Sequence, residues 1–334
     1  SGQLMNGNNT AEFEAWLAKK NKQKYAVTCH SGTHALEIIA GYYADNQVVS
    51  KPRAIIPSLT FAATANAFMR AGWEVYFADT DKYGVLDPRN IPVELSFQAV
   101  VAVGLYGAGI RHLDDANRWP RLALTNNHIY IEDGAQHWLA DNCRRESHAC
   151  AISFDPMKNL ACYGNGGAVV TNDLNLVEYA RAWREHGKSN HAYTGTNSRM
   201  SEIDCAQMMV KTRYIDRWHE RRNEIATYWI ERLKKNHIRC LIDDKNFEGH
   251  AFHKFVIDID SRDLVQRNLT LKKIETRVHY EQPVHELPAY TDCAGPDILS
   301  VASAMSRRVL SLPFYPELTD LEVEYVIHQV IDGV

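Results

Sequence analysis

Short β-rich runs alternate with helix-length segments through the first half of the chain, and this alternation constrains the fold most. The runs are Tyr25 to Cys29, Ala54 to Ile56, Val75 to Ala78, Ala99 to Val103, Ile129 to Glu132 and Ala149 to Phe154. Between two of them, residues 60 to 72 form a helical pattern that ends at Gly72. Alternation of this kind predicts an α/β fold with a mostly parallel sheet.

The second half of the chain has a different pattern and predicts a second domain. Apolar and charged residues recur at helical spacing from Ser201 to Lys235 without Pro or Gly, which indicates one or two long helices. A strand-like run at Phe252 to Ile259 and a helical pattern at Leu318 to Ile331 follow. Because 334 residues exceed one compact domain, we expect a large domain over 1–215 and a small α+β domain over 216–334.

Composition excludes several function classes. The 37 basic and 41 acidic residues give a net charge of -4, which argues against binding to nucleic acid or to an anionic lipid surface. No apolar run approaches the roughly 20 residues of a membrane-spanning helix. An odd number of scattered cysteines without a C-x-x-C pair predicts reduced thiols, no metal site and a cytoplasmic enzyme. The cysteines are Cys29, Cys143, Cys150, Cys162, Cys205, Cys240 and Cys293.

Three local patterns carry candidate chemistry, and each has an ordinary structural alternative. Ser31-Gly32-Thr33 lies between a strand and a helix, where free backbone amides bind phosphate, although an ordinary N-cap serine is the more frequent explanation of an isolated S-G-T. Asp133 ends an apolar strand at the sheet edge where α/β proteins bind ligands, or it caps a helix. Gln136 would lie on the same face as Asp133 if a helix began there, or it would be a solvated surface residue.

After Ser31-Gly32-Thr33 and the pair Asp133 and Gln136, the third pattern is a proline turn. This turn holds Lys158 directly after a buried strand. A lysine at a sheet edge can act as a Schiff-base nucleophile, but most lysines are solvated surface residues. The glycines at 164, 166 and 167 lack both the G-K-[ST] ending of a P-loop and the G-x-G-x-x-G pattern, which excludes those nucleotide loops.

Taken together, the motifs resemble the DegT/StrS family of pyridoxal-phosphate (PLP) aminotransferases that act on nucleotide-linked keto-sugars. The resemblance runs nearly end to end and implies a three-layer PLP-transferase fold of the aspartate-aminotransferase type. The matching segments are Ser31 to Leu36, Ile56 to Ala67, Glu132 to Gln136, Ser153 to Leu160, Gly166 to Asp173, His186-Gly187, Asn197 to Glu202 and Leu310 to Pro313.

The resemblance implies roles around the cofactor ring. Lys158 matches the family lysine that forms the internal aldimine with PLP, and Asp133 matches the carboxylate that keeps the pyridine nitrogen protonated. Gln136 matches the side chain near the phenolic oxygen. Phe61 takes the position of the aromatic residue that stacks on the ring, with core packing as its structural alternative.

The resemblance also implies a phosphate site and a shared dimer. Gly32, Thr33 and Ser153 match the groups that hold the phosphate, and Asn197 matches a phosphate ligand from the neighbouring subunit of a homodimer. Three further residues lie in segments that resemble nucleotide-sugar contacts, with surface or structural roles as alternatives. They are Arg199, Tyr280 and His285.

These features favour transfer of an amino group, with glutamate as donor and a nucleotide keto-sugar as acceptor. Two alternatives stay open: a sugar dehydratase of the same family, and a regulatory or scaffold protein that keeps the fold without turnover. The dehydratases replace the lysine with histidine, whereas Lys158 is present here. Asp155 departs from the family pattern, which often has an aromatic residue or histidine there, and adds an acidic group near the cofactor.

Overall fold

The structure is a computed structural model of the chain. It describes residues 2–92, 94–110, 128–140, 147–188, 191–243, 247–296 and 299–334. Six of the seven cysteines lie in these ranges as free thiols, whereas Cys143 lies outside the described residues. Within the described ranges, no helix combines the length and apolar character needed to cross a membrane.

A seven-stranded sheet organises the N-terminal part of the described chain. Its strands are β1 (Tyr25–Cys29), β2 (Arg53–Pro57), β3 (Glu74–Ala78), β4 (Ala99–Val103), β5 (Ile129–Asp133), β6 (Ala149–Ser153) and β7 (Gly167–Thr171). They lie in the order β1-β7-β6-β5-β4-β2-β3, and every neighbouring pair is parallel except the two pairs that include β7. The mostly parallel sheet predicted from the alternation is confirmed.

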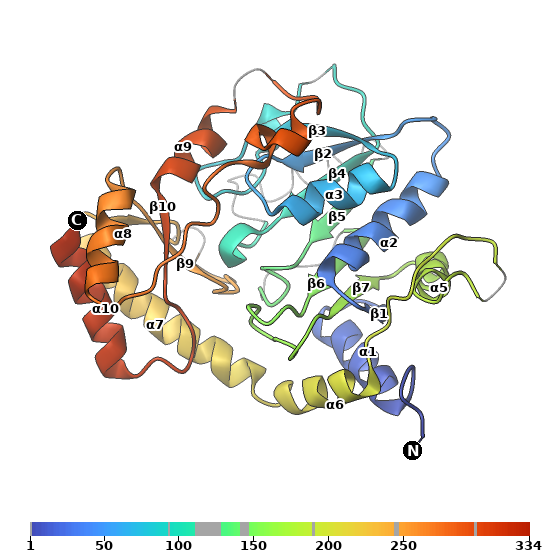
Figure 1. The fold of residues 1–334 in the computed structure, drawn as a ribbon, viewed down its shortest axis with the longest axis horizontal. Helices are drawn as coiled ribbons and strands as arrows, with labels where there is room; N and C mark the ends of the chain where they lie inside the picture. Colours follow the sequence, from blue (N-terminus) through green and yellow to red (C-terminus); the bar gives the residue numbers. More distant parts are fainter. Residues whose placement is uncertain are drawn as a thin grey trace.

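Helices cover both faces of this sheet, so the architecture has three layers (Figure 1). One outer layer holds α2 (Gly32–Asp45), α3 (Ala62–Arg70) and α5 (Leu174–Trp183), and the other holds α1 (Asn8–Lys20) and α6 (Glu202–Lys211). Val169 of β7 packs toward the first layer with Phe68, while its neighbour Val170 packs toward the second with Phe13. A strand buried on both faces requires this alternation of apolar side chains.

The C-terminal part has its own antiparallel sheet and its own core (Figure 1). Its elements are α7 (Ile215–Lys235), β8 (Arg239–Cys240), β9 (Phe255–Asp258), α8 (Arg262–Leu271), α9 (Ser300–Arg308), β10 (Val309–Leu312) and α10 (Asp320–Gly333). β9 lies between β10 and β8 and is antiparallel to both. Trp229 of α7 is fully buried, and its Nε1 donates to the carbonyl of Val323 at 2.9 Å. The expected smaller α+β part is therefore present.

Helix boundaries follow the local signals in the sequence. α3 begins two residues later than residue 60 because Phe61 keeps an extended backbone and serves as its N-cap. Gly72 lies just past the helix end with φ 85°, a conformation that glycine adopts without strain. The long helical stretch between Ser201 and Lys235 forms two helices, α6 and α7.

Candidate active site

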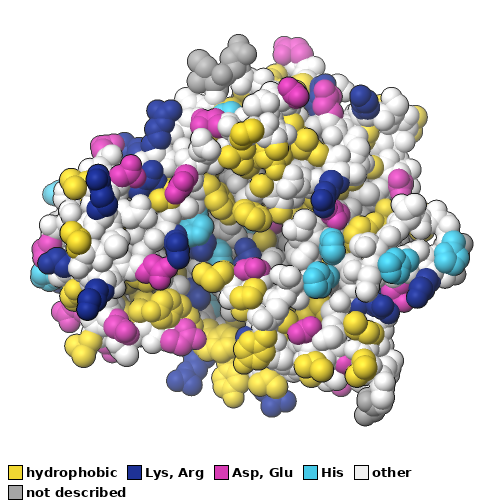
Figure 2. Space-filling model, in the orientation of Figure 1, with side chains coloured by type: hydrophobic (Ala, Val, Ile, Leu, Met, Phe, Trp, Pro, Cys, Tyr) yellow, Lys and Arg dark blue, Asp and Glu magenta, His cyan; other side chains and the backbone are white. Residues whose placement is uncertain are grey.

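Lys158 lines a groove of about 1080 Å³ between the two parts of the chain. The groove is bounded by the turn after β6, the first half of α7, and the segments around β9 and β10. Figure 2 shows the face of the molecule hollowed between these parts, with basic and histidine side chains inside the hollow. The proline turn predicted from the sequence thus places its lysine where a ligand can reach it.

The Lys158 amine has no hydrogen-bond partner among the described residues. Burial lowers the pKa of Lys158, and this effect outweighs the opposite influence of the Asp133 and Asp155 carboxylates. Lowering the pKa increases the neutral fraction of the amine near pH 7, and the neutral amine is the form that attacks a carbonyl or accepts a proton. The site is suited to nucleophilic and base chemistry at this nitrogen.

Asp133 is the last residue of β5, and its carboxylate is fixed by two hydrogen bonds. Thr64 donates to Oδ2 at 2.7 Å, and the backbone N–H of Ala135 donates to Oδ1 at 3.1 Å. Thr60 and Thr64 are joined hydroxyl to hydroxyl at 3.0 Å, which extends this support to the residue before Phe61. A buried carboxylate held in this way presents a fixed negative charge at the sheet edge.

Gln136 lies in a turn, so the helical face that it was expected to share with Asp133 is absent. The reason is local: Asp133 ends the strand and accepts the Ala135 amide, which starts a turn. The amide group of Gln136 nevertheless spans the site. Its Oε1 accepts from the Tyr106 backbone N–H at 2.7 Å, and its Nε2 donates to the Tyr280 hydroxyl at 3.3 Å.

Phe61 is not a core residue, because 58% of its surface is exposed. Its ring centroid lies 6.0 Å from that of Tyr280, and the two planes are inclined by 34°. Burial, reinforced by the Asp133 charge, raises the pKa of Tyr280, so its hydroxyl stays protonated near neutral pH. Phe61 and Tyr280 therefore provide an aromatic surface that a flat ligand ring can contact.

The N-terminus of α2 forms a cradle against the end of β6. Ser31 caps the helix by accepting the His34 amide at 3.1 Å, which leaves the Gly32 and Thr33 amides of the first turn without acceptors in the helix. A Cβ at position 32 would lie 2.7 Å from the Ser153 Cβ, so only glycine lets the two segments approach this closely. Free amides beside a serine hydroxyl suit a phosphate group.

Asn197 and Arg199 lie together on a segment away from the groove. Asn197 is exposed, and its Oδ1 accepts from Arg199 Nη2 at 3.4 Å. Arg199 also approaches the Glu185 carboxylate at 3.9 Å. Neither residue lines the Lys158 groove.

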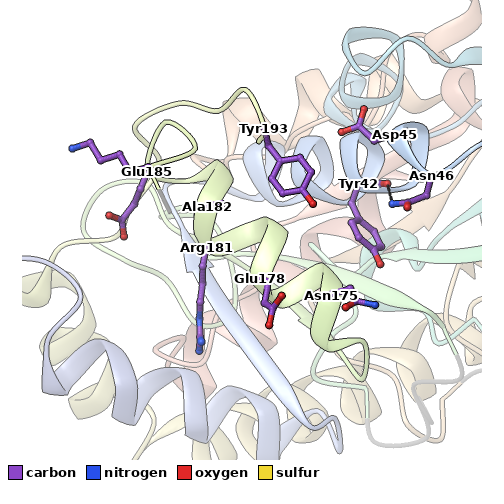
Figure 3. A pocket seen from close by; sticks show the side chains of 10 residues that line it. Tyr42, Asp45, Asn46, Asn175, Glu178, Arg181, Ala182, Glu185 and Tyr193 are labelled. Atoms are coloured by element: carbon purple, nitrogen blue, oxygen red, sulfur yellow. Dashed lines mark hydrogen bonds between the residues drawn. The ribbon is translucent and has the colours of Figure 1, made fainter. Parts of the chain in front are cut away.

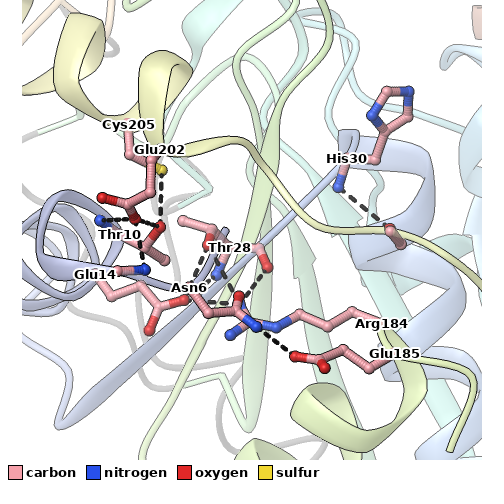
Figure 4. A network of polar contacts seen from close by, with 11 residues as sticks. Asn6, Thr10, Glu14, Thr28, His30, Arg184, Glu185, Glu202 and Cys205 are labelled. Atoms are coloured by element: carbon pink, nitrogen blue, oxygen red, sulfur yellow. Dashed lines mark hydrogen bonds and ion pairs between the residues drawn. The ribbon is translucent and has the colours of Figure 1, made fainter. Parts of the chain in front are cut away.

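A polar network ties this segment to the start of α2 (Figure 4). Ser198 is fully buried, its hydroxyl is 2.8 Å from His34 Nδ1, and it accepts from the His30 backbone amide at 3.2 Å. The Ser198 backbone N–H donates to the Arg184 carbonyl at 3.0 Å, and the Arg184 guanidinium pairs with Glu14 at 2.8 Å. Because His34 is on the first turn of α2, the network fixes residues 197–199 relative to the phosphate cradle.

His285 lies outside the groove lining, beside the loop after β2. Its Nδ1 is 2.9 Å from the Ser58 hydroxyl and its Nε2 is 3.8 Å from the Glu286 carboxylate. Burial lowers the pKa of His285, which leaves the imidazole neutral near pH 7. These contacts link the His285 imidazole to the loop after β2 and to Glu286.

Several groups near Lys158 were missed by the sequence analysis. Tyr106 adopts φ 61° and donates its hydroxyl to the carbonyl of His279. His279 and His253 line the groove, where burial lowers the pKa of each imidazole. Lys254 also lines it. The only sequence signal was the short glycine-flanked run around Tyr106, since lone histidines and lysines carry no pattern.

A second pocket of about 820 Å³ opens between α2 and α5 (Figure 3). It is lined by Tyr42, Asp45, Asn46, Asn175, Glu178, Arg181, Ala182, Glu185, Lys188 and Tyr193. None of the residues with a predicted catalytic, cofactor or substrate role lines it. The groove at Lys158 is therefore the candidate active site.

Of the predicted cofactor residues, Lys158 is the one that lines the groove, and Asp133 lies close enough to influence its pKa. As a set, the predicted cofactor residues fit PLP. The Gly32 and Thr33 amides with Ser153 provide a phosphate cradle, Asp133 provides a fixed charge for a ring nitrogen, and Lys158 provides an unpaired amine of lowered pKa. A phosphate cradle, a carboxylate for the ring nitrogen and a reactive amine are the groups that PLP requires.

Comparison with known proteins agrees with this geometry. Residues 1–331 match the DegT/DnrJ/EryC1/StrS aminotransferase family. The chain is 34% identical to the erythromycin biosynthesis sensory transduction protein EryC1 of Saccharopolyspora erythraea, over 98% of this chain and 90% of that protein. It is 32% identical to the dTDP-3-amino-3,4,6-trideoxy-alpha-D-glucose transaminase of Streptomyces venezuelae, over 99% and 88%.

Solved structures give the same result. A DegT DnrJ EryC1 StrS aminotransferase from Brucella abortus superposes with a TM-score of 0.90 at 29% identity, over 99% of this chain and 91% of that one. The resemblance found in the sequence motifs is confirmed by a match that extends from the first residue almost to the last, and the chain belongs to the DegT/DnrJ/EryC1/StrS aminotransferase family.

Proposed function

We propose that this protein moves an amino group from glutamate to a nucleotide-linked keto-sugar, with PLP as cofactor. The observation that carries the proposal is the unpaired Lys158 amine, buried in a groove near the Asp133 carboxylate. The Streptomyces venezuelae relative, whose name specifies a dTDP-linked amino sugar, supports a nucleotide sugar as acceptor.

In this mechanism Lys158 moves the protons. Bound PLP supplies a conjugated ring that takes up the electron pair of the C–H bond broken at the donor. Lys158 Nζ accepts the proton from the donor Cα, and its lowered pKa favours the neutral base that this step needs. The same nitrogen returns a proton to the acceptor carbon in the second half-reaction. Two successive half-reactions at one amine imply ping-pong kinetics.

Other residues would hold and orient the cofactor. Asp133, fixed by Thr64 and the Ala135 amide, would hold a proton on the pyridine nitrogen. The amides of Gly32 and Thr33 and the Ser153 hydroxyl would bind the phosphate. Gln136 would contact the phenolic oxygen, and Phe61, exposed beside Tyr280, would cover the face of the ring.

We infer that the active unit is a homodimer in which Asn197 of one subunit reaches the phosphate site of the other. Asn197 is exposed, its backbone pairs with Glu185 in a β-bridge, and its side chain forms one hydrogen bond among the described residues, with Arg199. The buried Ser198 beside it holds the segment in a fixed position from which a partner can be met. Arg199, Tyr280 and His285 remain candidates for contacts with the nucleotide-sugar.

We propose a boundary at residue 215/216 between a large PLP-binding domain over 1–215 and a small domain over 216–334. The separate sheets and cores on the two sides support this division. α7, which begins at Ile215, would connect the two domains, and the groove at Lys158 would lie between them.

The test is spectroscopic and chemical. Purified protein loaded with PLP should show visible absorption that bleaches when glutamate is added. A panel of nucleotide keto-sugars, with glutamate as donor and mass analysis of the products, then identifies the acceptor by its gain of an amino group. Cofactor absorption that glutamate leaves unchanged would contradict the proposal.

A regulatory role is the second candidate, and the name of the Saccharopolyspora erythraea relative, a sensory transduction protein, favours it. A purely regulatory protein would have no need for an unpaired amine of lowered pKa beside a fixed carboxylate. Insensitivity to glutamate together with normal PLP binding would favour regulation over transamination.

A further inference from the structure

Lys254 is a second lysine in the Lys158 groove, and no motif singles it out. It directly precedes β9, and its backbone N–H donates to the Tyr106 carbonyl at 2.9 Å. This bond joins the C-terminal part of the chain to the loop after β4. The position of Lys254 at the groove is thus set by the contact between the two parts.

The Lys254 ammonium lacks the kind of partner that three other basic groups of the groove have. Lys211 donates to a backbone carbonyl at 2.5 Å, Arg222 donates to two backbone carbonyls, and Arg277 forms an ion pair with a neighbouring glutamate. Lys254 makes no side-chain hydrogen bond or ion pair with any described residue. The Lys254 ammonium is therefore available to pair with a ligand that enters the groove.

The environment makes this unpaired charge unfavourable. Burial lowers the pKa of Lys254 to about 8, with Lys158 and Arg222 adding to the effect and Asp155 opposing it. A partly buried cation beside two other cations is stabilised by a counter-ion of opposite charge. The groove therefore favours an anionic group near Lys254.

The two histidines of the groove add no charge beside Lys254 near neutral pH. Burial lowers the pKa of His279 to about 4 and that of His253 below its ordinary value, so both imidazoles are neutral at pH 7. His253 Nδ1 is 3.2 Å from Asn159 Oδ1, and His279 Nδ1 is 2.8 Å from the Ser311 hydroxyl. The two imidazoles therefore add no positive charge, and a singly charged carboxylate, such as the amino donor carries, is a sufficient counter-ion for the Lys254 ammonium.

We propose that Lys254 binds a carboxylate of a substrate in the groove and thereby determines which substrates are accepted. This inference rests on the proposed function. Two sources supply such a carboxylate: the amino donor, or an acidic sugar on the nucleotide. The amine of Lys254 acts in binding only, and Lys158 keeps the proton transfer.

The experiment measures binding of unreactive probes to PLP-loaded protein by calorimetry. Glutarate against its uncharged diamide tests the donor arm, and UDP-glucuronate against UDP-glucose tests the sugar arm. The proteins are wild type, Lys254→Met, Lys254→Arg and the control Lys272→Met, which removes an exposed lysine of the same groove. Circular dichroism and PLP absorption establish that each variant is folded and loaded.

We expect Lys254→Met to weaken the binding of one carboxylate probe at least about tenfold, which corresponds to roughly 1.4 kcal/mol of binding free energy. The uncharged counterpart should bind unchanged, Lys254→Arg should retain most of the preference, and Lys272→Met should behave as wild type. The affected arm identifies the source of the carboxylate. Equal effects of Lys254→Met on charged and uncharged probes, or a wild type that prefers neither carboxylate, would overturn the proposal. Bleaching by glutamate in the same preparation tests the proposed function separately.

Discussion

At the scale of single residues, the chemistry of this protein depends on Lys158. Borohydride reduction of the PLP-loaded protein should fix the cofactor to Lys158, because its amine is unpaired and burial lowers its pKa. Peptide mapping by mass spectrometry gives the site. Attachment to another lysine, Lys254 included, would contradict the assignment.

Substitution of the same residue should separate cofactor binding from turnover. Lys158→Arg should keep PLP bound noncovalently and lose roughly 10³-fold or more in kcat, since a guanidinium stays protonated near neutral pH. Lys211→Arg is the matched control, because Lys211 lines the same groove and donates only to a backbone carbonyl. Equal activity of the two variants would exclude Lys158 as the base.

Asp133→Asn should reduce kcat by about 10²-fold or more while the affinity for PLP falls far less. The asparagine can still accept from Thr64 and Ala135, but it no longer holds the pyridine nitrogen protonated. Asp155→Asn is the control: it removes a carboxylate near Lys158 but retains the hydrogen bond from the Met157 amide. A rate for Asp133→Asn near that of wild type at saturating PLP would leave Asp133 as a turn cap only.

At the scale of secondary-structure elements, Glu202 of α6 caps the N-terminus of α1. Its carboxylate accepts from the backbone amides of Gly7, Asn9 and Thr10 at 2.7, 3.0 and 2.9 Å. Burial raises the pKa of Glu202, but hydrogen bonds from Thr10, Asn9 and Gly7 outweigh it and lower the pKa to about 2. The ionised carboxylate therefore stabilises the contact between α1 and α6.

This cap predicts a pH dependence of stability. Because the folded-state pKa lies below the ordinary value of 4.5, the contribution is present above pH 4.5 and is lost as the pH falls toward 2. Glu202→Gln should lower the free energy of unfolding at pH 7 by about 1–3 kcal/mol and flatten the loss of stability between pH 4.5 and 2. Urea unfolding at several pH values measures both, with Glu12→Gln on the exposed face of α1 as control. Parallel pH curves for wild type and Glu202→Gln would exclude the cap.

At the scale of the whole molecule, the proposed dimer predicts complementation between two inactive variants. Lys158→Ala homodimers lack the nucleophile in both sites, and Asn197→Asp homodimers repel the phosphate in both. If Asn197 serves the partner's site, a mixed dimer collects both lesions in one site and leaves the other intact. Co-refolded mixtures should then recover up to half of the wild-type activity per dimer.

The control for this experiment is each variant refolded alone, which should stay weakly active. If both lesions act within one chain, each mixed dimer contains two damaged sites and mixing recovers nothing. That result, or a fully active monomer in light scattering, would remove the shared site and leave the chemistry of Lys158 unaffected.

Much of the fold and of the candidate site could be predicted from local sequence signals. The alternation of apolar runs with helical segments predicted the mostly parallel sheet, because side-chain periodicity and turn residues act over short distances. The turn with Lys158, the strand end at Asp133 and the glycine at 32 were found for the same reason: each carries its signal within a few neighbouring residues.

Tertiary structure alone decided the rest. Gln136 was expected on a helix and lies in a turn. The sequence left core packing open for Phe61, and the structure shows its side chain exposed. Lys254 and His279 have no local pattern, and they reach Lys158 only because the C-terminal part packs against the loop that holds Tyr106. The charge of the groove comes from segments far apart in the sequence, and such long-range convergence is fixed by packing of the whole chain rather than by any local preference.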